Sequence, residues 1–413
     1  MSFFYNFFIH LFYLGILIAS PFNKKAALWI KGRKNILYKI KSSISPDDKI
    51  VWFHAASLGE FEQGKPLMEA FKKKFPEYKI LLTFFSPSGY EIRKNYKQAD
   101  FVFYLPIDTI QNARKFIEIV KPKKVFFIKY EFWFNYLKAL RKEKIPTYFV
   151  SSNFRKEQHF FKWYGRWFRK QLESINYFFV QNETSKNLLN SIGLSNVIVS
   201  GDTRFDSVQD LAKESKEFPL IEKFKNSKLL FIAGSTWLPD EEIIFELINK
   251  KNKNLKFIIA PHETTKDRIN SIYKRKKDKT IKFSELSSGK ICNEEILNAE
   301  ILIIDSIGIL KHLYKYATIT YIGGGFGVDI HNIQEPVTFG KPVIFGPKYN
   351  KFEEAVELLK LGGAFSITNQ DEFIGKTEKL LNDKSYCDKC SDICKKYIGS
   401  KTGATERILE NIS

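Results

Sequence analysis

Residues 320–347 read TYIGGGFGVDIHNIQEPVTFGKPVIFGP and indicate the fold of the chain. An apolar strand runs into a glycine cluster, a short helical segment begins near Asn332, and a second strand and turn follow over residues 341–347. Strands joined through helices are βα units, which build parallel sheets. In open sheets of this kind, ligands bind beyond the carboxyl ends of the strands. The residues that follow each apolar run are therefore the candidates for a binding site.

The same alternation of apolar runs and helical periodicity extends over most of the chain. The predicted strands are Lys49–His54, Lys79–Phe84, Lys124–Lys129, Thr147–Ser151, Tyr177–Gln181, Leu229–Ala233, Leu255–Ala260, Ile301–Asp305, Ile319–Gly323 and Pro342–Phe345. Charged residues interrupt this pattern at residues 206–228. We therefore predict two doubly wound, Rossmann-like α/β domains. They cover residues 45–205 and 229–385, with a linker at 206–228 and a helical segment at 386–413.

Composition agrees with a folded, two-domain chain and indicates an anionic partner. The 413 residues are 44% hydrophobic and 27% charged, which excludes a disordered or polytopic membrane protein. Lys and Arg number 66 against 46 Asp and Glu, a net charge of +20. Nucleic acid, anionic lipid and phosphorylated substrates are all compatible with that charge. With only four cysteines, there is no disulfide framework, and we predict a reducing compartment.

The first residues form an uncharged run, MSFFYNFFIHLFYLGILIAS, followed by Pro21 and a cluster of lysines. Its length is close to that of a membrane-spanning helix. The positive charges after it would keep the body of the protein in the cytoplasm. We predict a membrane anchor or interfacial helix at residues 1–22. A buried core helix and a cleaved signal are the alternatives.

Three charged residues stand out after strands of the first predicted domain. Glu60 lies in HAASLGEFEQGKP, where it is either a general base or an ordinary first-turn helix carboxylate. Glu131 is the only acid in the aromatic stretch IKYEFWFNYL, and a buried carboxylate needs a partner. Arg204 follows a strand that ends in Gly201. Its guanidinium could steady a phosphate, or it could pair with Asp202 or Asp206.

In the second predicted domain, the glycine-rich turn at residues 323–327 is the strongest signal. Such turns, when they lead into a helix, cradle phosphates through backbone N–H groups. Glu335 suits recognition of ribose hydroxyls. The alternative is that the glycines are there for close packing. The sequence contains no HExxH, GxSxG or GxxxxGK[ST] motif, and Cys387, Cys390 and Cys394 have the spacing of one buried helix face.

The motifs HAASLGE, KYEFWFN, SSNFRKE, GDTRFD, GSTWLPDEE, APHE, DSIGIL and GGGFGVDIHNIQEP occur in this order along nearly the whole chain. Together they resemble the Kdo transferases of lipopolysaccharide assembly, where Kdo is 3-deoxy-D-manno-octulosonic acid. The resemblance implies the two-domain GT-B architecture. It also implies metal-independent, inverting transfer of Kdo from CMP-Kdo to a lipid A precursor, without a cofactor. The implied place is the cytoplasmic face of the inner membrane, whose anionic lipid would be a further partner.

The resemblance assigns roles to individual residues. Glu60 corresponds to the general base, and Glu131 and Arg204 correspond to groups that stabilise the transition state. The implied CMP contacts are Pro261, His262, Ile307, Gly308, Ile309, Asn332, Ile333, Gln334 and Glu335.

The chain departs from the family pattern at several of these positions. Arg204 replaces the usual lysine, and Pro261-His262-Glu263 replaces Pro-Arg-His, so an arginine of the nucleotide site is missing. Ile309 replaces an acid, and Asp329-Ile330 replaces a Gly-Gly pair.

Two rival functions follow from the composition. One is a transferase of the same architecture that uses another nucleotide sugar. The other is a basic nucleic-acid-binding protein, which we do not expect because the charge is spread along the chain and no such motif occurs. The basic aromatic stretch at residues 154–170 is either an acceptor- or membrane-facing surface, or a solvated helix with a packed aromatic side.

Overall fold

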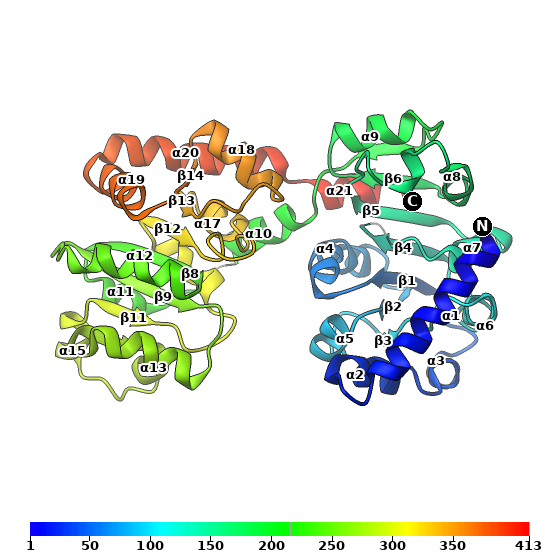
Figure 1. Ribbon diagram of the computed structural model, residues 1–413, viewed down its shortest axis with the longest axis horizontal. Coiled ribbons are helices and arrows are strands. Elements are labelled where there is room, and N and C mark those ends of the chain that lie inside the picture. Colours follow the sequence, from blue (N-terminus) through cyan, green and yellow to red (C-terminus); the bar gives the residue numbers. More distant parts are fainter. Residues whose placement is uncertain (130, 215, 413) are drawn as a thin grey trace. The chain divides into compact units, whose positions relative to one another are not determined.

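The computed structural model describes residues 1–129, 131–214 and 216–412. The chain divides into two compact units, which are considered separately below (Figure 1). Unit 1 comprises residues 1–207 and 402–413, and unit 2 comprises residues 208–401. Each unit contains one seven-stranded parallel sheet. The predicted pair of doubly wound α/β sheets is confirmed.

The sheet of unit 1 has the strand order β3-β2-β1-β4-β5-β6-β7. Its strands are β1 Ile50–Ala55, β2 Lys79–Phe84, β3 Phe101–Tyr104, β4 Lys124–Ile128, β5 Thr147–Ser152, β6 Tyr177–Val180 and β7 Val197–Val199. The helices are α1 Ser2–Ala19, α2 Lys24–Arg33, α3 Ile36–Ser43, α4 Leu58–Lys74, α5 Pro87–Arg93, α6 Ile110–Val120, α7 Phe134–Lys142, α8 Arg166–Leu172, α9 Glu183–Asn190 and α21 Ala404–Glu410.

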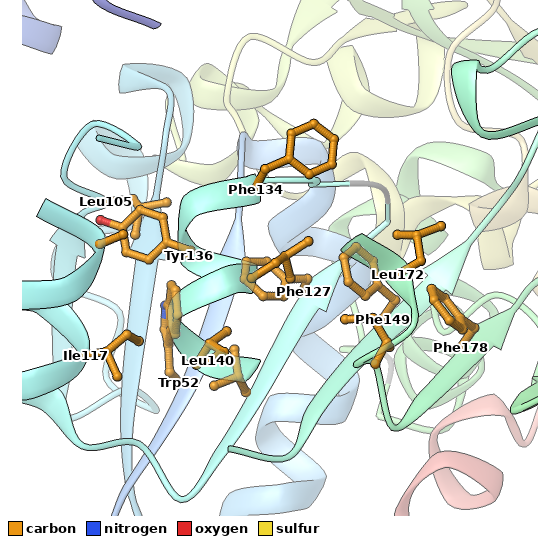
Figure 2. Packing of buried hydrophobic residues seen from close by; sticks show 14 of the residues in the cluster. Trp52, Leu105, Ile117, Phe127, Phe134, Tyr136, Leu140, Phe149, Leu172 and Phe178 are labelled. Atoms are coloured by element: carbon orange, nitrogen blue, oxygen red, sulfur yellow. The ribbon is translucent and has the colours of Figure 1, made fainter. Parts of the chain in front are cut away.

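Side-chain alternation along the central strands builds two cores, one on each face of this sheet. In β1, Trp52 points into the core formed with α3, α6 and α7, whereas Phe53 points into the core formed with α4 and α21. Figure 1 shows α4 and the α6–α7 pair on opposite faces of the sheet. Figure 2 shows Trp52, Phe127 and Tyr136 within the first of these cores. Strands buried on both faces are near-continuous apolar runs, which is why the sequence identifies them.

The sheet of unit 2 has the strand order β10-β11-β9-β8-β12-β13-β14. Its strands are β8 Leu229–Thr236, β9 Leu255–Pro261, β10 Thr280–Lys282, β11 Ile301–Ile303, β12 Ile319–Ile322, β13 Val343–Phe345 and β14 Ala364–Ser366. The helices are α11 Pro219–Lys225, α12 Leu238–Asn249, α13 Lys266–Arg275, α14 Phe283–Ser287, α15 Asn293–Asn298, α16 Leu310–Leu313, α17 Gln334–Thr338, α18 Glu353–Leu361, α19 Gln370–Asn382 and α20 Lys384–Lys401. Helix α10, Arg204–Lys213, carries the chain from unit 1 into unit 2.

The C-terminal residues 402–413 return to unit 1. The carboxylate of Asp206 accepts hydrogen bonds from the backbone N–H of Gly403 (2.6 Å) and Thr405 (2.7 Å). Ile408 and Leu409 of α21 are buried in the core beneath α4. The predicted helical segment at 386–413 is therefore divided between the two units, because only its last helix buries apolar side chains in unit 1. In α20, Cys387, Cys390 and Cys394 are buried, as their spacing predicts.

Helix α1 has no buried residue and is long and apolar enough to cross a membrane. The alternative of a core helix at the N-terminus is therefore wrong. Its exposed side chains include Phe3, Phe4, Phe7, Phe8, Leu11, Leu14 and Ile18. An exposed apolar surface of this extent is typical of a membrane or protein contact.

The basic aromatic stretch at residues 154–170 divides its aromatic side chains between core and solvent. Phe154 and Phe160 are buried, whereas Trp163 is 92% exposed. Part of the stretch therefore packs in the core, as one of the two alternatives predicts. The Trp163 side chain remains accessible to a partner.

Candidate functional site

The three predicted residues of unit 1 lie beyond the carboxyl ends of three parallel strands. Glu60 follows β1, Glu131 follows β4, and Arg204 follows β7. Strands β1 and β4 are neighbours at the centre of the sheet. Because parallel strands end at the same edge, all three segments reach the edge at which ligands bind in this fold. Lys129 and Ser151, at the ends of β4 and β5, have positive φ angles of 64° and 53°. Backbone strain of this kind clusters at functional sites.

Glu60 is in the first turn of α4, where its carboxylate accepts a hydrogen bond from the Ser57 hydroxyl. The N-cap residue Ser57 therefore orients the carboxylate instead of capping the helix. Gly59 is exposed, and a Cβ atom added there would meet only the Ser57 Oγ atom, at 3.7 Å. No described residue of unit 1 lies close enough to require a glycine at this position, and a glycine there costs helix stability. An approaching ligand would account for it.

Glu131 lies beside a buried histidine that cannot neutralise it. His54 Nε2 is 3.9 Å from Glu131 Oε2 and accepts a hydrogen bond from the Trp133 indole N–H (3.0 Å). An indole can only donate, so Nε2 carries no proton and the network assigns a neutral imidazole. His54 Nδ1 then donates to Thr83 Oγ1 (2.9 Å). No hydrogen-bond donor contacts the Glu131 carboxylate among the residues that the structure describes.

Glu131 also lines a cavity of about 650 Å³ at the same edge of the sheet. The side chain of Glu131 is 17% exposed, so it reaches this cavity without being fully solvated. Five of the eleven lining residues are Phe or Trp, and Asn153, Arg155, Glu157, Gln158 and His159 provide polar groups. Apolar walls with a few convergent polar groups are typical of a binding site for an organic ligand.

Arg204 is held by the carboxylate of Asp202, so the alternative of a pair with Asp202 is confirmed. Its Nε and Nη2 atoms donate to Asp202 Oδ2 at 2.9 and 2.6 Å. Burial alone would raise the pKa of Asp202. The charge of Arg204 and hydrogen bonds from Arg204 and Gln63 instead hold that pKa below its ordinary value. The Arg204 side chain is still 32% exposed. Gln63 is in α4, one turn beyond Glu60, and thus joins the Arg204 segment to the helix that carries Glu60.

In unit 2, the glycine cluster is explained largely by packing of the backbone against itself. A Cβ atom at Gly323 would lie 2.4 Å from the Ser235 carbonyl oxygen, and one at Gly325 would lie 2.7 Å from Gly346. Gly324 has a φ angle of 94°, which favours glycine. The glycines of this cluster are therefore needed for packing of the backbone, independently of any ligand. Gly327 has more room, since its nearest neighbour would be at 3.4 Å.

Asp240 of α12 fastens this turn to the helix. Its carboxylate accepts hydrogen bonds from the Tyr321 hydroxyl (2.7 Å) and from the backbone N–H of Trp237 (2.8 Å) and Gly324 (3.0 Å). Burial raises the pKa of Asp240. The motif GSTWLPDEE therefore supports the glycine turn directly.

His262 takes part in an aromatic stack at the carboxyl edge of unit 2. Pro261 is the last residue of β9 and is buried, and His262 follows it on the surface. The His262 ring stacks on both Trp237 and His331, with distances between ring centroids of 4.7 Å and 4.4 Å. The Trp237 indole N–H donates to His331 Nε2 (3.1 Å). Burial and the neighbouring His262 lower the pKa of His331, which favours a neutral ring. Stacked aromatic rings form a surface suited to a nucleobase.

The remaining predicted CMP contacts differ in accessibility. Within residues 332–335, the side chains of Ile333 and Gln334 are buried, whereas those of Asn332 and Glu335 can be reached by a ligand. Asn332 Oδ1 accepts from the backbone N–H of Gln334 (2.9 Å), and its amide donates to Glu335 Oε1 (3.4 Å). Ile307, Gly308 and Ile309 form the loop after β11, where Ile307 is exposed and Gly308 has a φ angle of 93°.

The structure places four side chains at these edges that the sequence analysis did not include in the site. Trp237 and His331 lie in quoted motifs, but only the fold brings them to His262. His54 is buried at the end of a strand and looks in sequence like a core residue. Arg268 of α13 forms an ion pair with buried Glu241 (2.6 Å). No cluster of His, Cys, Asp and Glu able to hold a metal occurs in the described ranges.

Two parallel doubly wound α/β sheets are typical of the GT-B architecture, and solved structures agree. The UDP-GlcNAc 2-epimerase from Neisseria meningitidis superimposes with a TM-score of 0.60 at 19% identity, over 88% of this chain and 99% of that one. A glycosyltransferase from Rickettsia africae gives a TM-score of 0.54 at 13% identity, over 88% and 97%. At these identities the likeness concerns the fold alone.

Sequence comparisons show which family the chain resembles. Residues 31–207 match the model of the family 3-deoxy-D-manno-octulosonic-acid transferase (kdotransferase). The 3-deoxy-D-manno-octulosonic acid transferase of Aquifex aeolicus is 28% identical over 83% of this chain and 89% of its own length. That of Haemophilus influenzae is 26% identical over 88% and 87%. Residues 31–207 therefore form a Kdo transferase domain, and similarity to Kdo transferases of lipopolysaccharide biosynthesis extends over most of the chain.

A third relative has a second activity in its name. The bifunctional glycosyltransferase/methyltransferase of Fusobacterium nucleatum is 28% identical over 82% of this chain. The chain spans about half of that relative, 54% of its length.

Proposed function

We propose that this protein transfers Kdo from CMP-Kdo to the 6′-hydroxyl of a lipid A precursor, at the cytoplasmic face of the inner membrane. The observation that carries the proposal is the pair Glu60 and Glu131, which follow adjacent central strands in the unit that matches the family model. Unit 1 would bind the acceptor, and unit 2 would bind the donor.

In the proposed reaction, Glu60 removes the proton from the acceptor hydroxyl. The alkoxide oxygen forms a bond to the anomeric C2 of Kdo, while the bond from C2 to the phosphate oxygen of CMP breaks. CMP leaves from the opposite face with the bonding electrons, so the configuration at C2 inverts. Two observations support this role for Glu60: the Ser57 hydroxyl orients its carboxylate, and Gly59 would leave room for an acceptor.

Glu131 and Arg204 would stabilise charge as the bond to CMP breaks. Positive charge develops on the Kdo ring, and the unneutralised carboxylate of Glu131 is suited to face it. The guanidinium of Arg204 is suited to the anionic groups of donor and acceptor, and Asp202 fixes its orientation. We assign no cofactor and no metal to this step.

The proposed partners account for the charge of the chain. Donor, acceptor phosphates and inner-leaflet lipid are all anionic, which matches the net charge of +20. An assay of CMP release tests the donor directly. We expect release from CMP-Kdo in the presence of the lipid acceptor, and none of the corresponding nucleotide from UDP-sugars. Turnover of a UDP-sugar would favour another transferase of this fold. Salt-sensitive DNA binding without any turnover would favour a nucleic-acid-binding protein.

Replacing Glu335 is expected to weaken nucleotide binding. Glu335→Ala removes a carboxylate that the proposal pairs with ribose hydroxyls, and unpaired groups of this kind cost about 1–3 kcal/mol. Calorimetric titration with CMP measures the loss. Glu378→Ala is a matched control, because Glu378 is paired with Lys250 on the surface of unit 2. Unchanged CMP affinity in Glu335→Ala would place the nucleotide elsewhere.

Removing residues 1–20 is expected to move the protein from the membrane fraction to the soluble fraction, since the deletion removes the exposed apolar side chains of α1. CMP binding should survive, because the proposed donor site lies in unit 2. Sedimentation of membranes and CMP titration measure the two effects. A truncated protein that sediments as fully as the parent would show that α1 is not the anchor.

A further inference from the structure

Helix α1 has a second, polar contact with unit 1 besides its exposed apolar side chains. The Tyr5 hydroxyl donates to Asp108 Oδ2 (2.5 Å), and Asn6 Oδ1 accepts from the Asn135 amide (3.0 Å). The Tyr5 ring packs edge-on against Phe134 at 5.0 Å. Figure 1 shows the first turns of α1 beside α7. A helix that served only as a membrane tether would need none of these contacts.

Asp108 joins α1 to the beginning of α7. Its buried carboxylate also accepts hydrogen bonds from the backbone N–H of Asn135 (3.1 Å) and Tyr136 (3.0 Å), in the first turn of α7. Burial raises the pKa of Asp108 to about 7, and the hydrogen bonds from Tyr5 and the two backbone groups act against that rise. Each donor therefore helps to keep the carboxylate charged and the helix end capped.

The capped end of α7 leads directly to Glu131. The helix begins at Phe134, and its N-cap residue Trp133 donates to His54, whose ring lies 3.9 Å from the Glu131 carboxylate. Tyr5, Asp108, the first turn of α7, Trp133 and His54 thus form a continuous series of contacts. It connects the apolar N-terminal helix with the candidate catalytic carboxylate.

We propose that Tyr5 and Asp108 are positioning residues, through which docking of α1 on unit 1 sets the geometry of the Glu131 segment. The outward face of α1 would contact lipid, while its inward face orders the site. Transfer would then depend on α1 even in detergent, where binding to a membrane does not limit the rate. This inference rests on the proposed transfer reaction and on the role of Glu131 in it.

Tyr5→Phe separates positioning from anchoring, because it removes one hydroxyl and keeps the apolar helix. In detergent micelles, we expect kcat for transfer to fall by about 3- to 30-fold, the range of couplings carried by such networks. The KM for CMP-Kdo and the fraction that sediments with membranes should not change. Tyr13→Phe is the matched control, since it removes the same group from the same helix. The Tyr13 hydroxyl makes no hydrogen bond within the described part of the chain, and Tyr13→Phe should retain full kcat.

Full kcat in Tyr5→Phe would overturn the inference, and so would an equal loss in Tyr13→Phe. If Tyr5→Phe is unstable in a thermal melt, Asn6→Ala tests the same docking from the neighbouring side chain, with a smaller fall in kcat expected. Compared with the protein that lacks residues 1–20, a variant carrying an unrelated apolar helix in their place should sediment with membranes again but should not regain kcat. Recovery of both properties would also overturn the inference. Absence of transfer in the unmodified protein would instead refute the proposed function.

Discussion

Glu60→Gln is expected to lower Kdo transfer by at least ~10²-fold, with CMP-Kdo binding little changed, since a general base contributes typically 10²–10⁴-fold. Glutamine keeps the size of the side chain and can still accept the hydrogen bond from Ser57. It cannot take the proton of the acceptor hydroxyl. Single-turnover transfer with CMP-Kdo in excess measures the loss in the chemical step.

A stability measurement must accompany this variant, because Glu60 is also a first-turn carboxylate whose removal costs only about 0.3–1 kcal/mol. Glu62→Gln is the matched control in the same helix, since Glu62 is paired with Arg93 on the surface. If Glu60→Gln transfers Kdo at a nearly full rate, Glu60 has no catalytic role and is only a first-turn helix carboxylate. Glu131 would then be the leading candidate for the base.

Glu131→Gln is expected to lower transfer by about 10²-fold, the scale on which preorganised electrostatic groups act. The variant removes the negative charge next to the neutral His54 and leaves the volume of the side chain unchanged. Because no donor among the described residues contacts this carboxylate, we expect a change in stability of no more than about 0.5 kcal/mol. The same transfer assay and a thermal melt measure both quantities.

Glu143→Gln provides the control for loss of a carboxylate near α7, because Glu143 lies at the opposite end of that helix. It should transfer Kdo at the rate of the unmodified protein. If Glu131→Gln also transfers at that rate, Glu131 is a structural residue, and both the transition-state role and the positioning inference fail.

The strands that sequence alone predicts are those buried on both faces. All ten runs of the sequence analysis coincide with strands, from β1 to β13. Three edge strands, β3, β10 and β14, are absent from the prediction, and the fourth, β7, is present there only as the strand that ends in Gly201. Edge strands are short and partly exposed, so their apolar pattern is weak. Phe101, Val102 and Phe103 of β3 are only partly buried.

The candidate site could be predicted where a polar residue directly follows a buried strand, as Glu60 and Glu131 do. The contacts of His54 could not be predicted, because its partners Thr83 and Trp133 come from other segments. The stack of Trp237, His262 and His331 is hidden for the same reason. For the glycines of residues 323–325, the sequence signals an unusual turn, but only the structure shows that the backbone itself occupies the space.

Mass spectrometry of a lipid A precursor incubated with CMP-Kdo and the full-length protein tests the central claim most directly. The account predicts that the acceptor gains the mass of one or more Kdo residues and that CMP is released in equal amount. Glu60→Gln, examined in parallel, should leave the acceptor largely unmodified. An unmodified acceptor with the folded, CMP-binding parent protein would contradict the account.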